Sequence, residues 1–186
     1  PAISDPGYKL IRECCKNSID YTLIPGPSAV ISALIMSGLP TDKFTFNGFI
    51  PKKMNEQNLC FEILKNEDKT AIFFESPKRL EKTIANLEKH LNPNRQIAIC
   101  KEMTKLHEQI VRDELSNILS RIQKKDIILK GEIVIVIEGS NNKKIKPSID
   151  SSIKREFLKK MSASDSAKLI SLITGENKRD IYKSLI

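Results

Sequence analysis

The stretch from Leu23 to Ala29 constrains the fold of this chain more than any other. Two apolar residues that suit a strand run into Pro25-Gly26-Pro27, whose prolines block continuation of the strand and restrict the backbone. Ser28 then opens an apolar run that ends at Gly38, which predicts a helix with Ser28 as N-cap and Gly38 as C-cap. The stretch therefore predicts a strand, a stiff turn and a helix in succession, with a bound group close to the Gly26 backbone. An ordinary turn of an α/β protein fits these residues equally well.

The length and composition indicate a folded globular protein. The chain has 186 residues, of which 40% are hydrophobic and 29% are charged, enough for one large domain or two small ones. No apolar run is long enough to cross a bilayer, and no signal peptide is visible. The chain begins at Pro1 rather than at a methionine. We therefore expect a further N-terminal portion to precede it.

Cysteine spacing and net charge give weaker indications. The four cysteines (Cys14, Cys15, Cys60 and Cys100) lack the spacing of a metal or redox motif, which predicts buried, reduced thiols in a cytosolic protein. The formal net charge of +8 suggests a polyanionic partner such as RNA. Because the lysines and arginines are dispersed along the chain, a lysine-rich composition explains the charge as well.

The start of the chain has the pattern of a strand, a helix and a second strand. Ile3 ends the first strand, Asp5 is the predicted N-cap of the helix, and Pro6 is its first residue. Tyr21 to Ile24 is the predicted second strand. Such a unit implies parallel pairing with a right-handed crossover, and ligands bind beyond the carboxyl ends of strands in such sheets.

Hydrophobic periodicity predicts the remaining elements. Strands are predicted over 44–49, 70–75, 96–100 and 133–137. Helices are predicted over 54–66, 78–91, 111–122, 153–161, 165–174 and 176–185. The polar stretch 139–150 is a predicted linker, and the last helices resemble a small helix-turn-helix around Gly175.

Short polar clusters lie at the predicted strand ends. They are Ser4-Asp5, Glu75-Ser76 with Lys78-Arg79, Lys101-Glu102-Met103-Thr104-Lys105 with Glu108, and Gly131-Glu132. Each cluster alone fits a solvated loop, whereas all of them in one α/β sheet predict a site. The chain has no Walker loop and no Gly-x-Ser-x-Gly elbow, and His90 and His107 are not at metal-ligand spacing. No metal site is predicted.

The same clusters, in this order, resemble a known family. The resemblance rests on Ser4 to Gly7, Pro25 to Ala29, Gly38-Leu39-Pro40, Gly48-Phe49-Ile50-Pro51, Phe74 to Arg79, Lys101 to Lys105, Gly131-Glu132, and Thr174 to Tyr182. The chain is similar to the tetrapyrrole-methylase superfamily and, within it, to the bacterial 16S ribosomal RNA 2′-O-ribose cytidine methyltransferases (the small-subunit methyltransferase I family). The family's glycine-rich first loop is absent from this chain.

The resemblance implies a two-domain α/β fold with the cofactor in the cleft between the domains. Residues 1–26 would then be the remnant of a truncated N-terminal domain, 27–139 the C-terminal domain, and 140–186 the linker and helical tail. It also implies a cytoplasmic, dimeric enzyme that transfers a methyl group from S-adenosylmethionine to RNA of the small ribosomal subunit. The implied cofactor contacts are Ser4, Asp5, Pro25, Gly26, Pro27, Ser28, Ala29, Ser76, Lys101, Thr104, Gly131 and Glu132.

Methyl transfer to a ribose hydroxyl requires alignment of the oxygen and removal of its proton. Glu102 and Lys105 are the candidate bases, with Glu75 and Arg79 as orienting partners. The basic face of the tail, with Lys178, Arg179 and Lys183, fits a phosphate-contacting helix, and it fits a solvated helix face equally well. Two other functions remain open: methylation of a porphyrin-like (precorrin-type) precursor, and a non-catalytic RNA-binding fragment.

Overall fold

The computed structural model describes residues 2–140 and 149–185. The chain divides into two compact units, Pro1–Asn141 and Asn142–Ile186, and each is considered by itself.

A five-stranded sheet forms the centre of the first unit in its described residues. Its order is β1 (Phe44–Phe49), β2 (Thr70–Glu75), β5 (Ile133–Ile137), β3 (Gln96–Lys101) and β4 (Gln109–Glu114). Only β1 and β2 pair in parallel, and the other pairs are antiparallel. It follows that β1, β2 and β3 run in one direction and end at the same edge of the sheet, where β5 begins.

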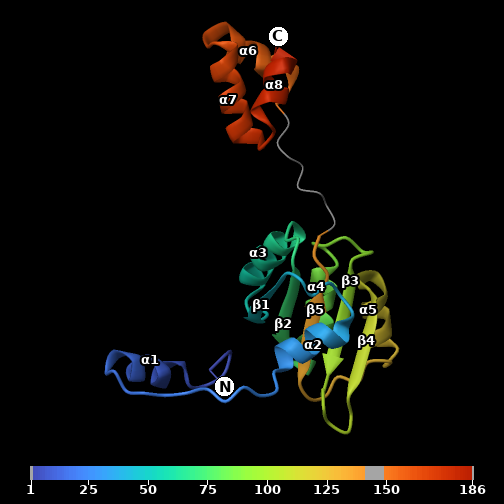
Figure 1. Ribbon diagram of the computed structural model, residues 1–186. Coiled ribbons are helices and arrows are strands. Elements are labelled where there is room, and N and C mark those ends of the chain that lie inside the picture. The colour runs from blue at the N-terminus through green and yellow to red at the C-terminus, as the bar shows by residue number, and fades with distance from the viewer. Residues whose placement is uncertain (1, 141–148, 186) are drawn as a thin grey trace. The chain divides into compact units, whose positions relative to one another are not determined.

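Helices cover both faces of this sheet (Figure 1). On one face, α3 (Met54–Lys65), α4 (Pro77–Leu87) and α5 (Leu115–Gln123) enclose the larger core. On the other face, α2 (Ala29–Ser37) packs through Ala33 and Leu34 against the small and β-branched residues of β2, β3 and β5. The sheet is therefore buried on both sides, which explains why β5 is an unbroken apolar run.

Both predicted caps of α2 are confirmed. The Ser28 hydroxyl accepts a hydrogen bond from the Ile31 amide at 3.4 Å, and Gly38 is left-handed at φ 72°. Arg112 of β4 adds a third restraint, because its guanidinium donates to the carbonyls of Met36 and Ser37 at the last turn. A cation at this end of a helix also complements the helix dipole.

The predicted strands before this helix are wrong. Residues 21–24 form no strand, and α1 (Tyr8–Lys16) starts after Gly7, so Asp5 is not its cap. A strand needs a hydrogen-bonding neighbour, and the five strands of the sheet provide none for this segment. Leu23 and Ile24 are consequently exposed, and α1 has no buried residue.

The helix predicted over 111–122 begins later. Residues Gln109–Glu114 pair with β3 as strand β4, and α5 starts only at Leu115. Val111 therefore lies in a strand, because cross-strand hydrogen bonds outweigh the short stretch of helical periodicity that begins there.

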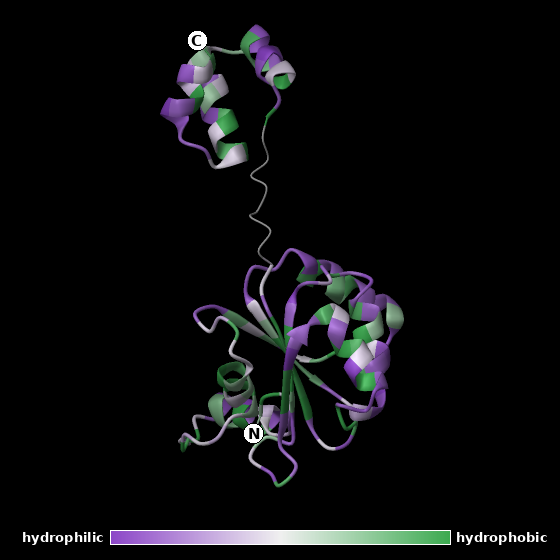
Figure 2. Cartoon of the chain, turned by 90° about the vertical axis from the view of Figure 1, so that its right-hand side faces the viewer, coloured by the Kyte–Doolittle hydropathy of each residue, from purple (hydrophilic) through white to green (hydrophobic). Residues whose placement is uncertain are grey.

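The second unit consists of α6 (Ser151–Lys160), α7 (Ala163–Thr174) and α8 (Lys178–Leu185). Ala167, Ile170 and Ile181 form its buried centre, and Gly175 ends α7 in the left-handed conformation at φ 68°. Figure 2 shows apolar and polar stretches alternating along its helices. The confirmed part of the tail is thus its three helices, whereas most of the predicted linker lies outside the described residues.

All four cysteines are free thiols. Cys100 is buried, and burial raises the pKa of its thiol to about 11. Cys15 is exposed, so the prediction that the thiols are buried is wrong for this residue. Within 2–140 and 149–185, no helix is long and apolar enough to cross a membrane.

Candidate functional site

Three of the predicted clusters meet at one edge of the sheet. The last residue of β2, Glu75, and the last residue of β3, Lys101, both pair with Ile133, the first residue of β5. The loops that follow β2 and β3 and the loop that precedes β5 therefore start from neighbouring strands. The strand directions thus bring together side chains that are far apart in the sequence.

Glu102 is the centre of a small polar cluster at this edge. Its Oε1 accepts a hydrogen bond from the Glu132 amide at 2.8 Å and another from Lys105 Nζ at 3.0 Å. Lys105 Nζ also lies 3.0 Å from Glu132 Oε2. Among the described residues, Glu102 Oε2 accepts no hydrogen bond. The protein thus fixes one oxygen of the carboxylate through two hydrogen bonds.

These hydrogen bonds set the ionisation of both groups. Donation by the Glu132 backbone amide and then by the Lys105 ammonium lowers the pKa of the Glu102 carboxyl. The hydrogen bonds to Glu102 and Glu132 raise the pKa of the Lys105 ammonium. At neutral pH Glu102 is therefore a carboxylate and Lys105 a protonated cation.

Gly131 is required for this arrangement. Its φ is 80°, in the left-handed region, and a Cβ at this position would lie 2.2 Å from Glu102 Cδ. Any side chain at position 131 would therefore displace the Glu102 carboxylate. The β3–β4 loop is itself tightly folded, since Glu102 and Thr104 also have positive φ and Glu108 accepts from the Thr104 amide at 2.6 Å.

Glu75 and Arg79 form a second, buried network. The Glu75 side chain is completely buried, and its Oε2 accepts from the Thr83 hydroxyl at 2.7 Å and lies 3.3 Å from Arg79 Nη2. Arg79 Nη2 also donates to the carbonyls of Ile50 and Pro51, at 3.0 and 2.8 Å. This network joins the ends of β1 and β2 to the first turns of α4. It holds these strand ends in place, and its carboxylate is not accessible at the surface.

Sequence reasoning missed Thr83. The signal is a hydroxyl residue on the apolar face of α4, beside the fully buried Leu80 and Ile84. Lys101 is a further buried group at this edge, with its Nζ 3.4 Å from the His107 carbonyl.

The predicted cofactor residues that precede α2 lie in exposed coil. Ser4 and Asp5 are exposed, as are Pro25, Gly26 and Pro27. A Cβ at Gly26 would meet no atom within 4 Å, so packing in this structure does not require a glycine there. Open space beside a bare backbone is consistent with a bound group at this turn.

The three predicted RNA contacts lie in the second unit. Lys178, Arg179 and Lys183 are all exposed on α8. Two of these cations occupy the first turn of α8, where the helix dipole favours negative charge. Their position thus adds little to the stability of the helix.

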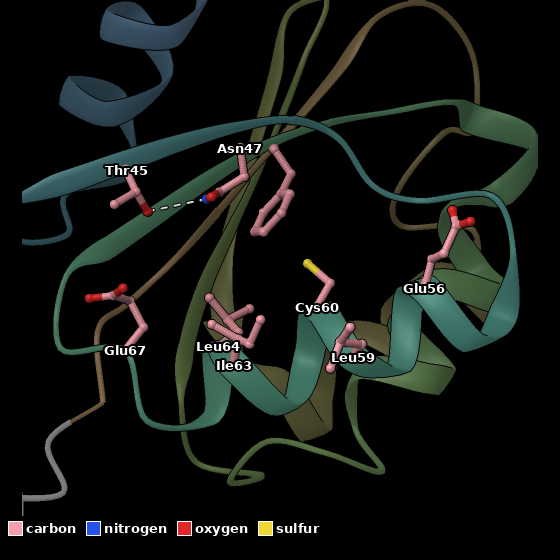
Figure 3. Close-up of a pocket in the computed structure, with 9 residues that line it drawn as sticks. Thr45, Asn47, Glu56, Leu59, Cys60, Ile63, Leu64 and Glu67 are labelled. Atoms are coloured by element: carbon pink, nitrogen blue, oxygen red, sulfur yellow. Dashed lines mark hydrogen bonds between the residues drawn. The ribbon is translucent and has the colours of Figure 1, made fainter.

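A cavity of about 300 Å³ lies between β1 and α3 (Figure 3). Leu59, Cys60 and Leu64 line its apolar side, and Thr45 and Asn47 line its polar side. None of the predicted site residues borders it. In the described part of the chain, no group of three or more histidine, cysteine, aspartate or glutamate residues is arranged to hold a metal ion.

Comparison with curated proteins finds relatives named ribosomal RNA small subunit methyltransferase I. The relative from Hydrogenobaculum is 41% identical over 141 residues, which are 76% of this chain and 60% of the relative. The relative from Thermotoga maritima is 42% identical over 75% of this chain and 61% of its own length. This chain thus spans about 60% of each.

Solved structures with a similar fold include two methyltransferases. CobJ matches with a TM-score of 0.51 at 15% identity, over 72% of this chain and 57% of that protein. Uroporphyrin-III-C-methyltransferase from Thermus thermophilus matches with a TM-score of 0.52 at 14% identity, over 74% and 60%. These likenesses concern the fold.

The family comparison agrees with the geometry described above. The model of the tetrapyrrole (corrin/porphyrin) methylases matches residues 1–119, which include the proline-glycine turn, both buried strand ends and the Glu102 loop. This match covers more than half of the sequence. The chain therefore belongs to the tetrapyrrole (corrin/porphyrin) methylases.

Proposed function

We propose that this protein transfers a methyl group from S-adenosylmethionine to the 2′-hydroxyl of a cytidine ribose in small-subunit (16S) ribosomal RNA. The observation that carries the proposal is the Glu102 cluster, an ionised carboxylate held at a strand-end edge in a chain 41–42% identical to proteins named as ribosomal RNA methyltransferases. Identity to CobJ is 15% and to uroporphyrin-III-C-methyltransferase 14%. RNA is therefore preferred over a tetrapyrrole as the substrate.

The residues present fit the cofactor at two places. The bare backbone at Gly26 has open space beside it, at the turn that leads into α2. The loops that contain Thr104 and Glu132 would approach from the sheet edge. When bound, S-adenosylmethionine supplies a methyl group that its sulfonium already activates.

Proton removal is the chemistry that this chain must supply. Glu102 would accept the ribose hydroxyl proton at Oε2 while Oε1 stays fixed by the Glu132 amide. Lys105 would keep the carboxylate ionised and oriented. Glu75 and Arg79 would act indirectly, by holding the ends of the neighbouring strands. Alignment of the hydroxyl is expected to supply most of the acceleration, as in other reactions between bound partners.

Replacement of Glu102 by glutamine should slow methyl transfer about 10²–10⁴-fold, the usual contribution of one general base.

In the wild type, Glu102 stays ionised until the pH falls through its lowered pKa, and Lys105 stays protonated until the pH rises through its raised pKa. The rate should therefore be flat between about pH 6 and 9, well inside the ordinary carboxyl and ammonium values. Single-turnover rates across this range test it, and a wild-type inflection near pH 7 would refute the assignment.

The second unit is proposed to contact RNA phosphates through α8. It contains eight lysines and arginines against five aspartates and glutamates over 149–185. Replacement of Lys178, Arg179 and Lys183 by glutamine should weaken RNA binding at all sequences. It should also reduce the slope of the logarithm of the RNA-binding constant against the logarithm of the salt concentration by about 2–3. The reason is that each phosphate that is no longer contacted keeps its counterion.

Titration of labelled RNA at several salt concentrations measures this slope. Lys82, Lys89 and Lys124, three exposed lysines of the first unit, provide a matched loss of charge. A variant with all three replaced by glutamine should keep the wild-type slope. An unchanged slope in the α8 variant would remove α8 from the RNA interface.

We also propose that residues 1–26 belong to an N-terminal α/β domain that holds the cofactor together with residues 27–139. The exposed Leu23 and Ile24, and an α1 without buried residues, support this division. The small ribosomal subunit as substrate, a homodimer and a cytoplasmic location are parts of the same proposal. Sedimentation velocity of the protein tests the dimer.

The substrate proposal is tested by offering radiolabelled S-adenosylmethionine with either unmethylated small ribosomal subunits or a uroporphyrinogen. This chain and its upstream-extended form would be assayed together. Label in the RNA alone supports the proposal. Label in the tetrapyrrole alone would replace it with the small-molecule reaction, and label in neither from either protein would favour a non-catalytic RNA-binding role.

A further inference from the structure

Phe49 is an exposed aromatic residue on an otherwise rigid segment. It is the last residue of β1, its exposed fraction is 57%, and its ring packs edge-on against Phe74 with centroids 5.5 Å apart. Phe46 packs on the same Phe74 ring at 4.9 Å. One face of an ordered aromatic cluster is thus open at the end of the strand.

A bulge in β1 gives Phe49 this orientation. The register with β2 shifts between Phe46 and Phe49, so that Phe49 pairs with Phe74 instead of with Glu75. Without the extra residue, Phe49 would lie on the face of Glu75, which is buried toward α4. Gly48, at φ 69°, permits the bulge. The bulge therefore turns an aromatic ring out of the core and onto the face that α2 covers.

Three hydrogen bonds, to Phe74 and from Arg79, hold the segment after the bulge. The Ile50 amide donates to the Phe74 carbonyl at 3.1 Å. Arg79, anchored on the buried Glu75, donates to the carbonyls of Ile50 and Pro51. The Glu75–Arg79 network thus fixes the backbone next to Phe49 and so positions the Phe49 ring.

The open ring lies beside the residues already assigned to the site. A Cβ at Gly48 would lie 3.2 Å from the Ser4 hydroxyl, so the Ser4 loop approaches the bulge closely. Phe74, the partner ring, immediately precedes Glu75 at the edge where β2, β3 and β5 meet. A flat ligand on Phe49 would therefore lie near Ser4, one of the proposed cofactor contacts, and beside the end of β2.

We propose that Phe49 is a stacking platform for a nucleobase, either of the RNA substrate or of the adenine of S-adenosylmethionine. Exposed aromatic rings on strand ends bind unpaired bases by stacking, which suits any base because all bases are planar. The proposal deepens the proposed function and rests on it for the identity of the base. Rigid mounting lowers the entropy cost of such binding.

The chain contains no tryptophan, so Phe49→Trp introduces a single fluorescent reporter at the platform. Its emission would be followed during titration with oligocytidylate, with an abasic ribose-phosphate oligomer of equal length, and with S-adenosylhomocysteine. A change of at least about twofold with oligocytidylate but not with the abasic oligomer assigns the base to RNA. A change with S-adenosylhomocysteine alone assigns it to the cofactor. No response to any of the three overturns the proposal.

Phe44→Trp is the matched control, because Phe44 is also partly exposed, at 38%, but begins β1 at the opposite end. Its emission should not respond. Phe49→Leu should raise the KM for the ligand that stacks by about tenfold or more, and Phe49→Tyr should restore it. Thermal melting confirms that each variant is folded. Stacking without methyl transfer by the wild type would contradict the proposed function and leave the platform standing.

Discussion

Replacing Gly131 by alanine should lower methyl transfer by about 10²-fold or more. The new Cβ would lie within 2.4 Å of three atoms of the Glu102 side chain. Glu102 would have to move, which breaks its hydrogen bonds to the Glu132 amide and to Lys105. Displacement of a reacting group by about 1 Å is enough for a loss of this size.

The same substitution should cost little stability. The atoms that must yield belong to the end of a flexible side chain, so the main cost is the left-handed backbone of residue 131, about 1–2 kcal/mol for a residue with a Cβ. Thermal melting and single-turnover kinetics on the same protein separate the two effects. A loss of activity that matches the unfolded fraction would contradict the account.

Two variants serve as controls for Gly131→Ala. Gly175 has a similar φ of 68°, but no atom lies within 4 Å of a Cβ built there. Gly175→Ala should therefore lose a similar amount of stability. Its rate of methyl transfer at saturating RNA should not change. In a Glu102→Ala background, Gly131→Ala should cause little further loss of activity, because the displaced side chain is already absent. Such a lack of additivity is expected of residues that are in contact or share one network, and not of distant, independent sites.

The largest loss of stability is expected from Arg95→Ala. This buried guanidinium donates to the carbonyls of Leu64 at 2.9 Å, Glu67 at 3.2 Å and Glu138 at 2.5 Å, and it thereby joins the end of α3 to the end of β5. Truncation would leave the Glu138 carbonyl without its donor and would take one of two donors from the Leu64 and Glu67 carbonyls, which also accept from the amides of Glu67 and Ser140. Loss of these bonds from a buried site is expected to cost about 3–5 kcal/mol. The melting temperature should fall by about 10 °C, as measured by circular dichroism.

Arg95→Lys should restore little of the lost stability, because one ammonium group cannot reproduce the planar guanidinium that reaches three carbonyls. Arg121→Ala is the matched control. It removes an arginine of similar size whose ion pair with Asp113 is partly exposed, and its cost should stay within about 1 kcal/mol. Equal losses in the two variants would show that burial of Arg95 is not what matters.

The sequence was most informative where local chemistry decides structure. Ser28 and Gly38 cap α2 as predicted, because a hydroxyl N-cap and a left-handed glycine act within a few residues. The strands β2, β3 and β5 could be predicted because each is a short, nearly unbroken run of apolar residues. The polar clusters at their ends could be found because acidic, hydroxyl and basic residues together serve no purpose in a strand.

The features that could not be predicted from the sequence depend on contacts between residues far apart in the chain. Strand β4 was missed because its identity depends on hydrogen bonds to β3, which no local pattern encodes. Residues 21–24 have a strand pattern without a partner strand among the described residues. Thr83 could not be recognised as a partner of Glu75, since only the packing of α4 on β2 brings them to 2.7 Å.

The central claim is methylation of a ribose hydroxyl, and the chemical identity of the methylated nucleoside tests it most directly. RNA from small subunits treated with the upstream-extended protein and labelled S-adenosylmethionine would be digested to nucleosides and resolved by mass spectrometry. The account predicts label in 2′-O-methylcytidine, lost in Glu102→Gln. Label on a nucleobase, or in a nucleoside other than cytidine, would contradict it.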